Sequence, residues 1–172
     1  MLTHKTKLFL SLVCLLVLTD CTTKQLAVLH LPPEEPREMI GSALRFTLVY
    51  NPGAAMSLSF GPSSRWAFTA LALLALTVLG YLYRNTQVGD LRQAAALALV
   101  CGGAIGNLVD RLRSPLGVVD FIDVGVGNHR FWTFNVADMA ITLGVVLLGV
   151  LLLRRDRLPE REPERLGPLG AP

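Results

Sequence analysis

The chain has 172 residues, of which 52% are hydrophobic and 17% charged, and its mean hydropathy of +0.49 is higher than is usual for a soluble domain of this length. The net charge of +3 is small, and the basic residues flank apolar runs, so they indicate membrane topology rather than a nucleic-acid-binding surface. The length suits a single domain. Cys14, Cys21 and Cys101 form no CxxC pattern, which argues against a disulfide framework or a zinc site and predicts small buried side chains.

Four apolar segments are candidates for membrane-spanning helices, which need about 20 residues. They cover residues 8–29, 66–83, 94–109 and 134–153. We therefore predict a mainly α-helical membrane protein with one four-span domain over residues 1–153. Residues 154–172 are rich in charge and proline, which predicts a disordered cytoplasmic tail.

At the N-terminus, two lysines, an apolar run and then Cys21 are also typical of a lipoprotein signal peptide, which is cut before the cysteine. The residue before such a cysteine is normally small and neutral, whereas here it is Asp20, and the apolar run continues to Leu29. We therefore expect the first segment to be retained as a span.

Basic residues at the segment ends predict the topology. They are Lys5 and Lys7 before the first segment, Arg84 and Arg92 around the second link, and Arg154, Arg155 and Arg157 after the fourth. With four spans, all of these fall on one side, which the positive-inside rule assigns to the cytoplasm. Both termini are then cytoplasmic, and residues 30–65 and 110–133 face outward.

The first outward segment contains a strand-like stretch at residues 44–50, rich in β-branched and aromatic residues. Asn51, Pro52 and Gly53 follow it and predict a turn. We expect a small sheet, or cradle, on the outer membrane surface. The second outward segment has a mixed pattern, from which we expect a short loop or interfacial helix.

Polar residues interrupt the first span. Asp20 and Lys24 are four residues apart and share a helix face. They predict either an ion pair that helps both charges tolerate the interface, or a lysine that positions a substrate or a catalytic group.

The end of the third span carries a second group of polar and small residues. Gly102 and Gly106 form a small-xxx-small face that lets another helix approach closely. Asn107 and Arg111 share a face on which they could hold a peptide carbonyl or a lipid oxygen. We expect Asp110 to anchor the following loop or to pair with a neighbouring base.

Two aspartates at the edge of the apolar segments are the strongest functional signal. Asp120 lies in an apolar context, and Asp138 lies in the first turn of the fourth span, where Asn135 shares its helix face. Charge at a bilayer edge is costly and is functional more often than ordinary surface charge. By itself Asp138 could be a helix cap. Two carboxylates that meet can instead share one proton and activate a water, as in an aspartic peptidase.

A small ion- or proton-coupled transporter is the competing hypothesis, with Asp20, Asp110, Asp120 and Asp138 as a relay. The acids cluster at one outer edge rather than at the midplane, and no internal repeat pairs the two halves, both of which argue against a transporter. A structural membrane subunit would not need two acids in apolar contexts.

Five short blocks follow one another along the chain: DCTTK at 20–24, NPGAAMS at 51–57, GGAIGNLVDR at 102–111, VDFI at 119–122 and FNVAD at 134–138. In the same order they resemble the blocks D-x-x-[ST]-K, N-x-G-A-A-F-S, G-G-A-x-G-N-x-x-D-R, V-D-F-I and F-N-x-A-D of the signal peptidase II family, the prolipoprotein signal peptidases. The resemblance covers nearly the whole chain up to Arg154. Met56 departs from it, because the family usually has Phe there.

The resemblance implies an aspartic endopeptidase of the bacterial inner membrane that cuts diacylglyceryl-modified prolipoproteins just before the lipidated cysteine, with its site near the outer face. It implies Asp120 and Asp138 as the catalytic pair. The residues implied to bind substrate are Asn51, Gly53, Asn107, Arg111 and Asn135, with Asp20, Lys24 and Asp110 in support. It implies no metal and no other cofactor. The expected partners are lipidated prolipoproteins and membrane lipid, not nucleic acid, and we expect a monomer.

Overall fold

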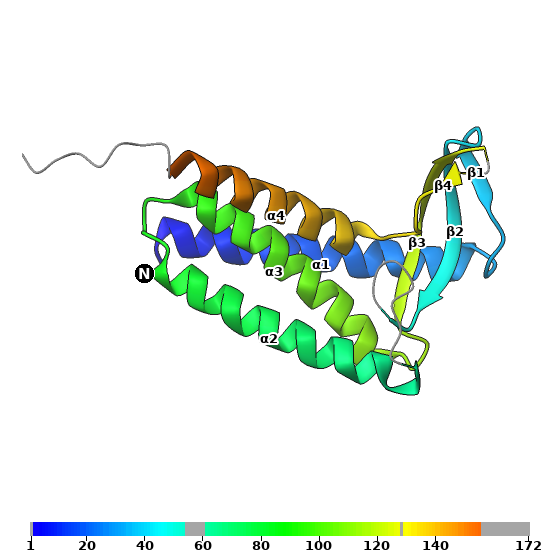
Figure 1. The fold of residues 1–172 in the computed structure, drawn as a ribbon, viewed down its shortest axis with the longest axis horizontal. Helices are drawn as coiled ribbons and strands as arrows, with labels where there is room; N and C mark the ends of the chain where they lie inside the picture. Colours follow the sequence, from blue (N-terminus) through cyan, green and yellow to red (C-terminus); the bar gives the residue numbers. More distant parts are fainter. Residues whose placement is uncertain (1, 54–60, 128, 156–172) are drawn as a thin grey trace, which may run out of the picture.

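The computed structural model describes residues 2–53, 61–127 and 129–155. Its elements, in chain order, are α1 (His4–His30), β1 (Arg37–Ile40), β2 (Leu44–Asn51), the 3₁₀ turn η2 (Gly61–Ser63), α2 (Ser64–Asn85), α3 (Leu91–Arg113), β3 (Val118–Val126), β4 (His129–Arg130) and α4 (Val136–Arg155). The four α-helices run lengthwise beside one another, and the sheet stands across one end of them (Figure 1). The N-terminus and the end of α4 both lie at the opposite end (Figure 1).

All four predicted spans are confirmed as helices that are long and apolar enough to cross a membrane. Most of the helices extend a few residues beyond the predicted bounds, and at the starts of α1 and α3 a polar side chain caps the extended helix. The Thr3 side chain accepts a hydrogen bond from the Thr6 amide at the start of α1, and Asp90 accepts one from the Gln93 amide at the start of α3. Only α4 begins later than predicted, since the residues before it pair with the sheet.

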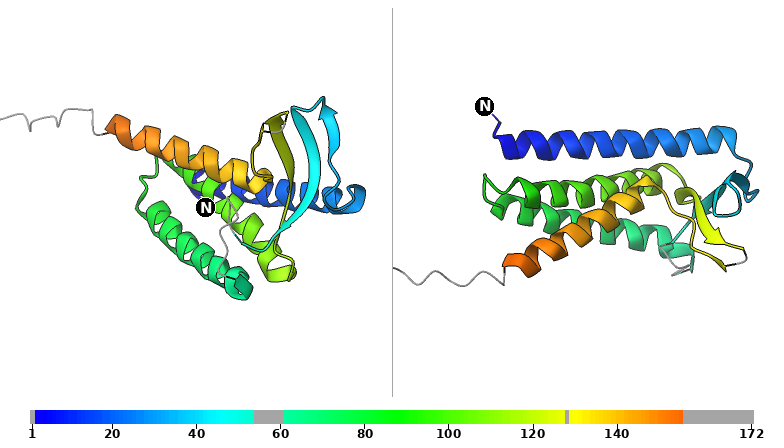
Figure 2. Two further views of the ribbon diagram at one scale, coloured as in Figure 1. Left: turned by 45° about the vertical axis from the view of Figure 1, so that its right-hand side comes forward. Right: turned by 90° about the horizontal axis from the view of Figure 1, so that it is seen from above.

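Small residues allow α3 to pack closely against its neighbours on two sides. A Cβ on Gly102 would meet Leu16 of α1 at 2.9 Å, and one on Gly103 would meet the backbone oxygen of Ala137 in α4 at 2.4 Å. The close helix approach predicted from Gly102 and Gly106 is therefore confirmed. The second helix, α2, is the least buried of the four spans, and the left view of Figure 2 shows it beside α3 and apart from α4.

The sheet is antiparallel with the strand order β1-β2-β3-β4. The predicted strand at 44–50 is confirmed by β2. The expected short loop or interfacial helix in the second outward segment was wrong for residues 118–126, which form the long central strand β3. Most side chains of β3 are at least partly buried on both faces, and such a strand lacks the alternating pattern that identifies strands in sequence.

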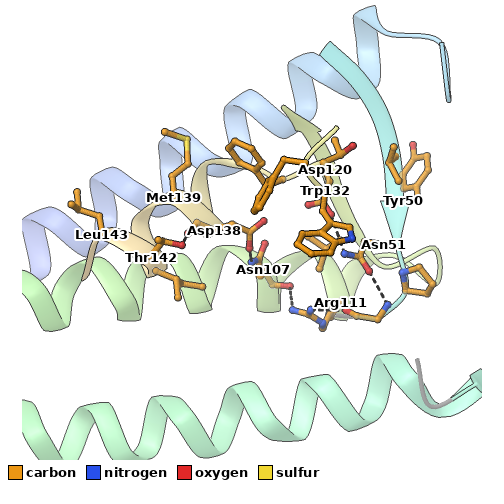
Figure 3. Close-up of a pocket in the computed structure, with 18 of the residues that line it drawn as sticks. Tyr50, Asn51, Asn107, Arg111, Asp120, Trp132, Asp138, Met139, Thr142 and Leu143 are labelled. Atoms are coloured by element: carbon orange, nitrogen blue, oxygen red, sulfur yellow. Dashed lines mark hydrogen bonds between the residues drawn. The ribbon is translucent and has the colours of Figure 1, made fainter. Parts of the chain in front are cut away.

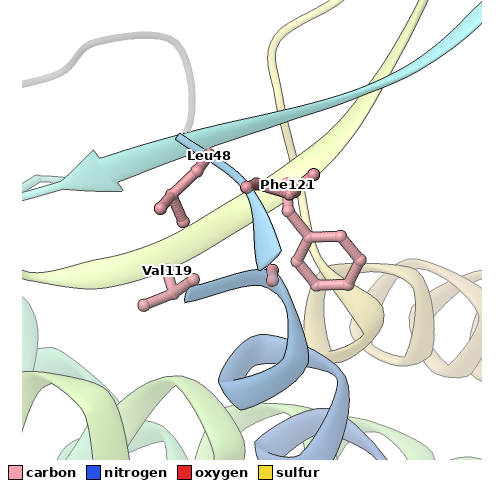
Figure 4. Close-up of a cluster of buried hydrophobic side chains, with 5 residues drawn as sticks. Leu48, Val119 and Phe121 are labelled. Atoms are coloured by element: carbon pink, nitrogen blue, oxygen red, sulfur yellow. The ribbon is translucent and has the colours of Figure 1, made fainter. Parts of the chain in front are cut away.

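A small apolar core joins the sheet to the C-terminal end of α1. Leu48 of β2 packs with Val119 and Phe121 of β3 against Ala27 and Leu31 (Figure 4). This contact holds β3 over the ends of the helices, and so determines where Asp120 lies.

The prediction that all three cysteines are buried was wrong in part. Each is a free thiol, but only Cys101 is buried, whereas Cys21 is partly exposed and Cys14 is exposed. In a membrane-spanning helix, such an outward-facing side chain meets lipid rather than water.

Candidate active site

Backbone pairing brings Asp120 and Asp138 to the same place. The Phe134 oxygen accepts hydrogen bonds from the amides of Phe121 and Ile122, and the Phe134 amide donates to the Ile122 oxygen. The chain just before α4 is therefore bound to β3 as a short extra bridge. Since α4 begins two residues later, its first turn starts beside Asp120.

Asn135 caps α4 and contacts both aspartates. Its side-chain oxygen accepts from the Asp138 amide at 3.0 Å, while a carboxylate oxygen of Asp138 accepts from the Asn135 amide at 3.2 Å. This reciprocal pair is a capping box, so Asp138 does take part in capping. The Asn135 side-chain amide also donates to Oδ1 of Asp120 at 2.6 Å. One fully buried asparagine thus sets the position of the two carboxylates.

Two further asparagines complete the contacts of the pair. Asn51 donates to Oδ2 of Asp120 at 3.1 Å, and Asn107 donates to Oδ1 of Asp138 at 2.8 Å. Each of the four carboxylate oxygens therefore accepts a hydrogen bond from an amide N–H. Among the described residues neither carboxylate forms a salt bridge.

The electrostatics of β3 set Asp120 apart from its neighbour Asp123. Burial, together with the charge of Asp138, raises the pKa of Asp120 to about 7. For Asp123, burial acts in the same direction, but hydrogen bonds and charge from Arg130 and Arg45 outweigh it and hold the pKa below its ordinary value. One strand thus carries a carboxyl group that can keep its proton near neutral pH and another that stays ionised.

Next to the two aspartates but outside the cavity, Lys24 forms salt bridges with two other acids. Its ammonium lies 2.7 Å from Asp20 and 3.0 Å from Asp110, and it donates to the Asn107 side-chain oxygen at 2.9 Å. Asp20 also accepts a hydrogen bond from the Ala137 amide in the first turn of α4. The predicted Asp20–Lys24 ion pair is therefore present, and Asp110 both pairs with a base and anchors the loop by accepting from the Val119 amide.

A cavity of about 1170 Å³ opens beside the pair, between the end of β2, the segment at 131–134 and the N-terminal half of α4. Asp120, Asp138, Asn51 and Asn107 gather around it in Figure 3. Its walls are mostly apolar. They include Tyr50, Trp132, Met139, Leu143 and Val146. A second cavity of about 280 Å³ lies between α2 and the α3–α4 pair and reaches Asn107, Arg111 and Asp138 from the other side.

Most of the predicted substrate-binding residues line the larger cavity: Asn51, Gly53, Asn107 and Arg111. Asn135 does not, and its complete burial fits the positioning of the two aspartates rather than substrate contact. The Arg111 guanidinium donates to the backbone oxygens of Asn107 and Gly53, so the arginine also ties α3 to the turn after β2.

Sequence reasoning missed the aromatic and apolar walls of the cavity, above all Trp132 and the α4 side chains Met139, Leu143 and Val146. On α4 the signal was available, because residues at i, i+4 and i+7 share a helix face. Met56, the one departure from the family blocks, lies outside the described residues. Within the described part of the chain, no group of three His, Cys, Asp or Glu side chains is arranged to hold a metal ion.

The four apolar helices define a multi-pass membrane protein. At one end of these helices, beside the small sheet, two carboxylates accept hydrogen bonds from amide N–H groups and face a cavity. Residues 12–154 match the family model described as signal peptidase (SPase) II. The chain belongs to the signal peptidase II family, which confirms the resemblance of the five blocks.

Individual proteins agree with this assignment. The chain is 38% identical to the lipoprotein signal peptidase of Syntrophus aciditrophicus over 154 residues, covering 87% of this chain and 94% of that protein. It is 44% identical to that of Paraburkholderia phytofirmans over 120 residues, 69% of each protein. A solved structure of a bacterial membrane enzyme superposes with a TM-score of 0.79 at 28% identity, covering 90% of this chain and 93% of the other.

Proposed function

We propose that the chain is an aspartic endopeptidase that removes signal peptides from bacterial prolipoproteins, cutting just before the lipidated cysteine. The observation that carries this proposal is the pair Asp120 and Asp138, bonded to asparagine amides on one side and open to a cavity on the other. Family membership supports the substrate class. The transporter hypothesis is not favoured, since the relatives are named lipoprotein signal peptidases.

In this mechanism the two aspartates share one proton. The raised pKa of Asp120 makes it the partner that holds the proton near neutral pH, and Asp138 is then the ionised base. Asp138 takes a proton from a water molecule as that water attacks the scissile carbonyl, while Asp120 donates its proton to the carbonyl oxygen. Collapse of the tetrahedral intermediate breaks the C–N bond: the proton held by Asp138 passes to the leaving amine of the cysteine, and Asp120 takes its proton back from the hydroxyl group that becomes the new carbonyl.

The shape of the cavity supports a lipidated substrate. Its apolar wall follows α4 from Asp138 to Val146, two turns into the span, and Met139 and Leu143 are exposed along it. A substrate that arrives sideways from the bilayer would place its peptide bond at the pair and leave its acyl chains against this apolar wall. No extraction of the lipid into water is then needed, which saves the cost of exposing apolar surface.

We also propose that the site lies at the outer face of the inner membrane and that both termini are cytoplasmic. In support, the helix ends with most basic residues lie opposite the sheet (Figure 1). Single cysteines at Pro36 and Gln87, probed in intact cells with an impermeant thiol reagent and with the native cysteines replaced, test this. Labelling at Gln87 but not at Pro36 would invert the topology. Asn128, a further outward site by sequence, lies outside the described residues.

A direct assay tests the proposed activity. Purified protein in detergent should cut a diacylglyceryl-modified prolipoprotein with no ion gradient, and should do so equally with and without EDTA. The protein should elute from a sizing column at the mass expected for a monomer in a micelle. Loss of cleavage with EDTA and its recovery with a divalent ion would rule out the metal-free mechanism.

A further inference from the structure

Lys24 lies close to the catalytic pair but outside the cavity. It is 2% exposed, it sits between α1 and α3, and the cavity wall does not include it. Direct contact with substrate is therefore excluded by position. Its three bonds reach Asp20, Asp110 and Asn107. Of these three, only Asn107 has a side chain that donates directly to a carboxylate of the pair.

The bond to Asn107 determines which way that side-chain amide points. The Asn107 oxygen accepts from two donors, Lys24 at 2.9 Å and Asn135 at 3.1 Å. Its nitrogen is then left to donate to Oδ1 of Asp138 at 2.8 Å. The reversed amide would place an NH₂ group against the ammonium and an oxygen against the carboxylate, and both contacts would be repulsive.

We propose that Lys24 is a positioning residue for the reaction: it holds the Asn107 amide in the orientation that donates to Asp138, and its charge favours the ionised form of the carboxylate pair. This inference rests on the proposed function of the pair. Lys24 acts through Asn107 and through its electric field, and it exchanges no proton with the substrate.

The charges around the two aspartates determine what the loss of Lys24 would do to their shared proton. Burial and the charge of Asp138 on α4 raise the pKa of Asp120, whereas hydrogen bonds from Asn51 and Asn135, and then the charge of Lys24 on α1, lower it. Arg111 on α3 also interacts with both members of the pair. Lys24 itself faces Asp20 on its own helix and Asp110 on α3. Removing the ammonium therefore leaves more negative charge behind the pair, which raises the pH at which the pair loses its shared proton.

The test compares Lys24→Gln with Lys5→Gln in the full-length protein, assayed on a lipidated prolipoprotein. Lys5 is also a buried lysine of α1, but it donates to the Tyr83 and Thr86 oxygens at the end of α2, far from the site. For Lys24→Gln we expect kcat per folded molecule to fall by about a hundredfold with little change in KM. We expect the upper limb of its pH–rate profile to move to higher pH. Lys5→Gln should lower thermal stability and leave kcat and the limb unchanged.

Two further variants make the result decisive. Lys24→Arg keeps the charge and a donor, so the upper limb of its pH–rate profile should lie at the wild-type pH. If Lys24→Gln does not fold, the double variant Lys24→Gln/Asp110→Asn removes one charge of each sign, and it should show the same lowered kcat. A wild-type kcat and limb in the Lys24 variants, with Asp120→Asn and Asp138→Asn inactive, would overturn this inference alone. Active Asp120→Asn and Asp138→Asn variants would overturn the proposed function instead.

Discussion

Two pairs of carboxylates lie at the end of the helices next to the sheet, and the partners of their oxygens differ. Asp20 and Asp110 share the ammonium of Lys24, which lies 2.7 Å from the first carboxylate and 3.0 Å from the second. Within the described residues, Asp120 and Asp138 accept hydrogen bonds only from amide N–H groups. Because amides bring no positive charge, the second pair lowers its energy by keeping a proton. Both pairs include a buried carboxylate, so a cation partner, rather than burial, separates the structural carboxylates from the two proposed to be reactive.

The largest effect should come from removing either reactive carboxylate. We expect Asp120→Asn and Asp138→Asn each to lower kcat on the order of 10⁴-fold, since an amide can neither accept the proton of the water nor donate like a carboxylic acid. Both variants should remain folded, because an asparagine keeps the shape of the side chain. Cleavage of a lipidated prolipoprotein measures the effect. Asp123→Asn, on the same strand but paired with Arg45 and Arg130, is the matched control and should stay active.

Asp20, which pairs with Lys24, should affect stability more than activity when it is replaced. Asp20→Ala removes the partner of Lys24 and the cap on the Ala137 amide, so we expect it to lower the free energy of unfolding by about 3 kcal/mol or more. Thermal unfolding in detergent measures this loss. The remaining folded protein should lose far less activity than the Asp120 and Asp138 variants. Wild-type stability with no activity would place Asp20 with the reactive pair.

The pH dependence of cleavage tests the shared proton directly. The pKa of Asp120 is raised to about 7, so the protonated acid that the mechanism needs is lost as pH rises through that value. We expect kcat to be independent of pH just below this pKa and to fall about tenfold per pH unit above it. A rate that keeps rising up to pH 9 would exclude Asp120 as the proton donor.

The smallest effect should come from one amide contact. Asn51→Ala removes the hydrogen bond to Oδ2 of Asp120, which favours the ionised form, so the pH limb should move upward. The lost bond is worth about 1 kcal/mol, which corresponds to roughly a fivefold fall in kcat. Thr47→Val removes the analogous donor to Asp123 on the neighbouring part of the sheet and should leave the limb in place. Equal shifts in both variants would point to a general distortion of the sheet.

Sequence reasoning identified the helices well and the sheet poorly. The spans follow from long apolar runs, because within a membrane a single segment can satisfy its own backbone groups only as a helix. By contrast, β3 is partly buried on both faces because it lies between β2 and the ends of the helices. Such a strand has no alternating pattern in its sequence from which it could be predicted. For the same reason, the segment around Asp120 was expected to be a loop or an interfacial helix.

For the site, residue identity was readable from the sequence but the role of each asparagine was not. Asn51, Asn107 and Asn135 were all expected to contact substrate. In the structure Asn135 is fully buried between the two aspartates, and Asn107 has its oxygen occupied by Lys24. An amide can face a ligand or a neighbouring side chain equally well, so only the distances to its partners distinguish the two.

By itself the sequence determined the membrane class, the four spans, the family and the two acidic residues at the edge of the apolar runs, because apolar length and short ordered motifs are local properties of the chain. The tertiary structure decided which acids have a cation and which have only amides. That difference arises where α1, α3, β3 and the first turn of α4 meet, and it depends on contacts between residues as far apart in sequence as Asp20 and Ala137.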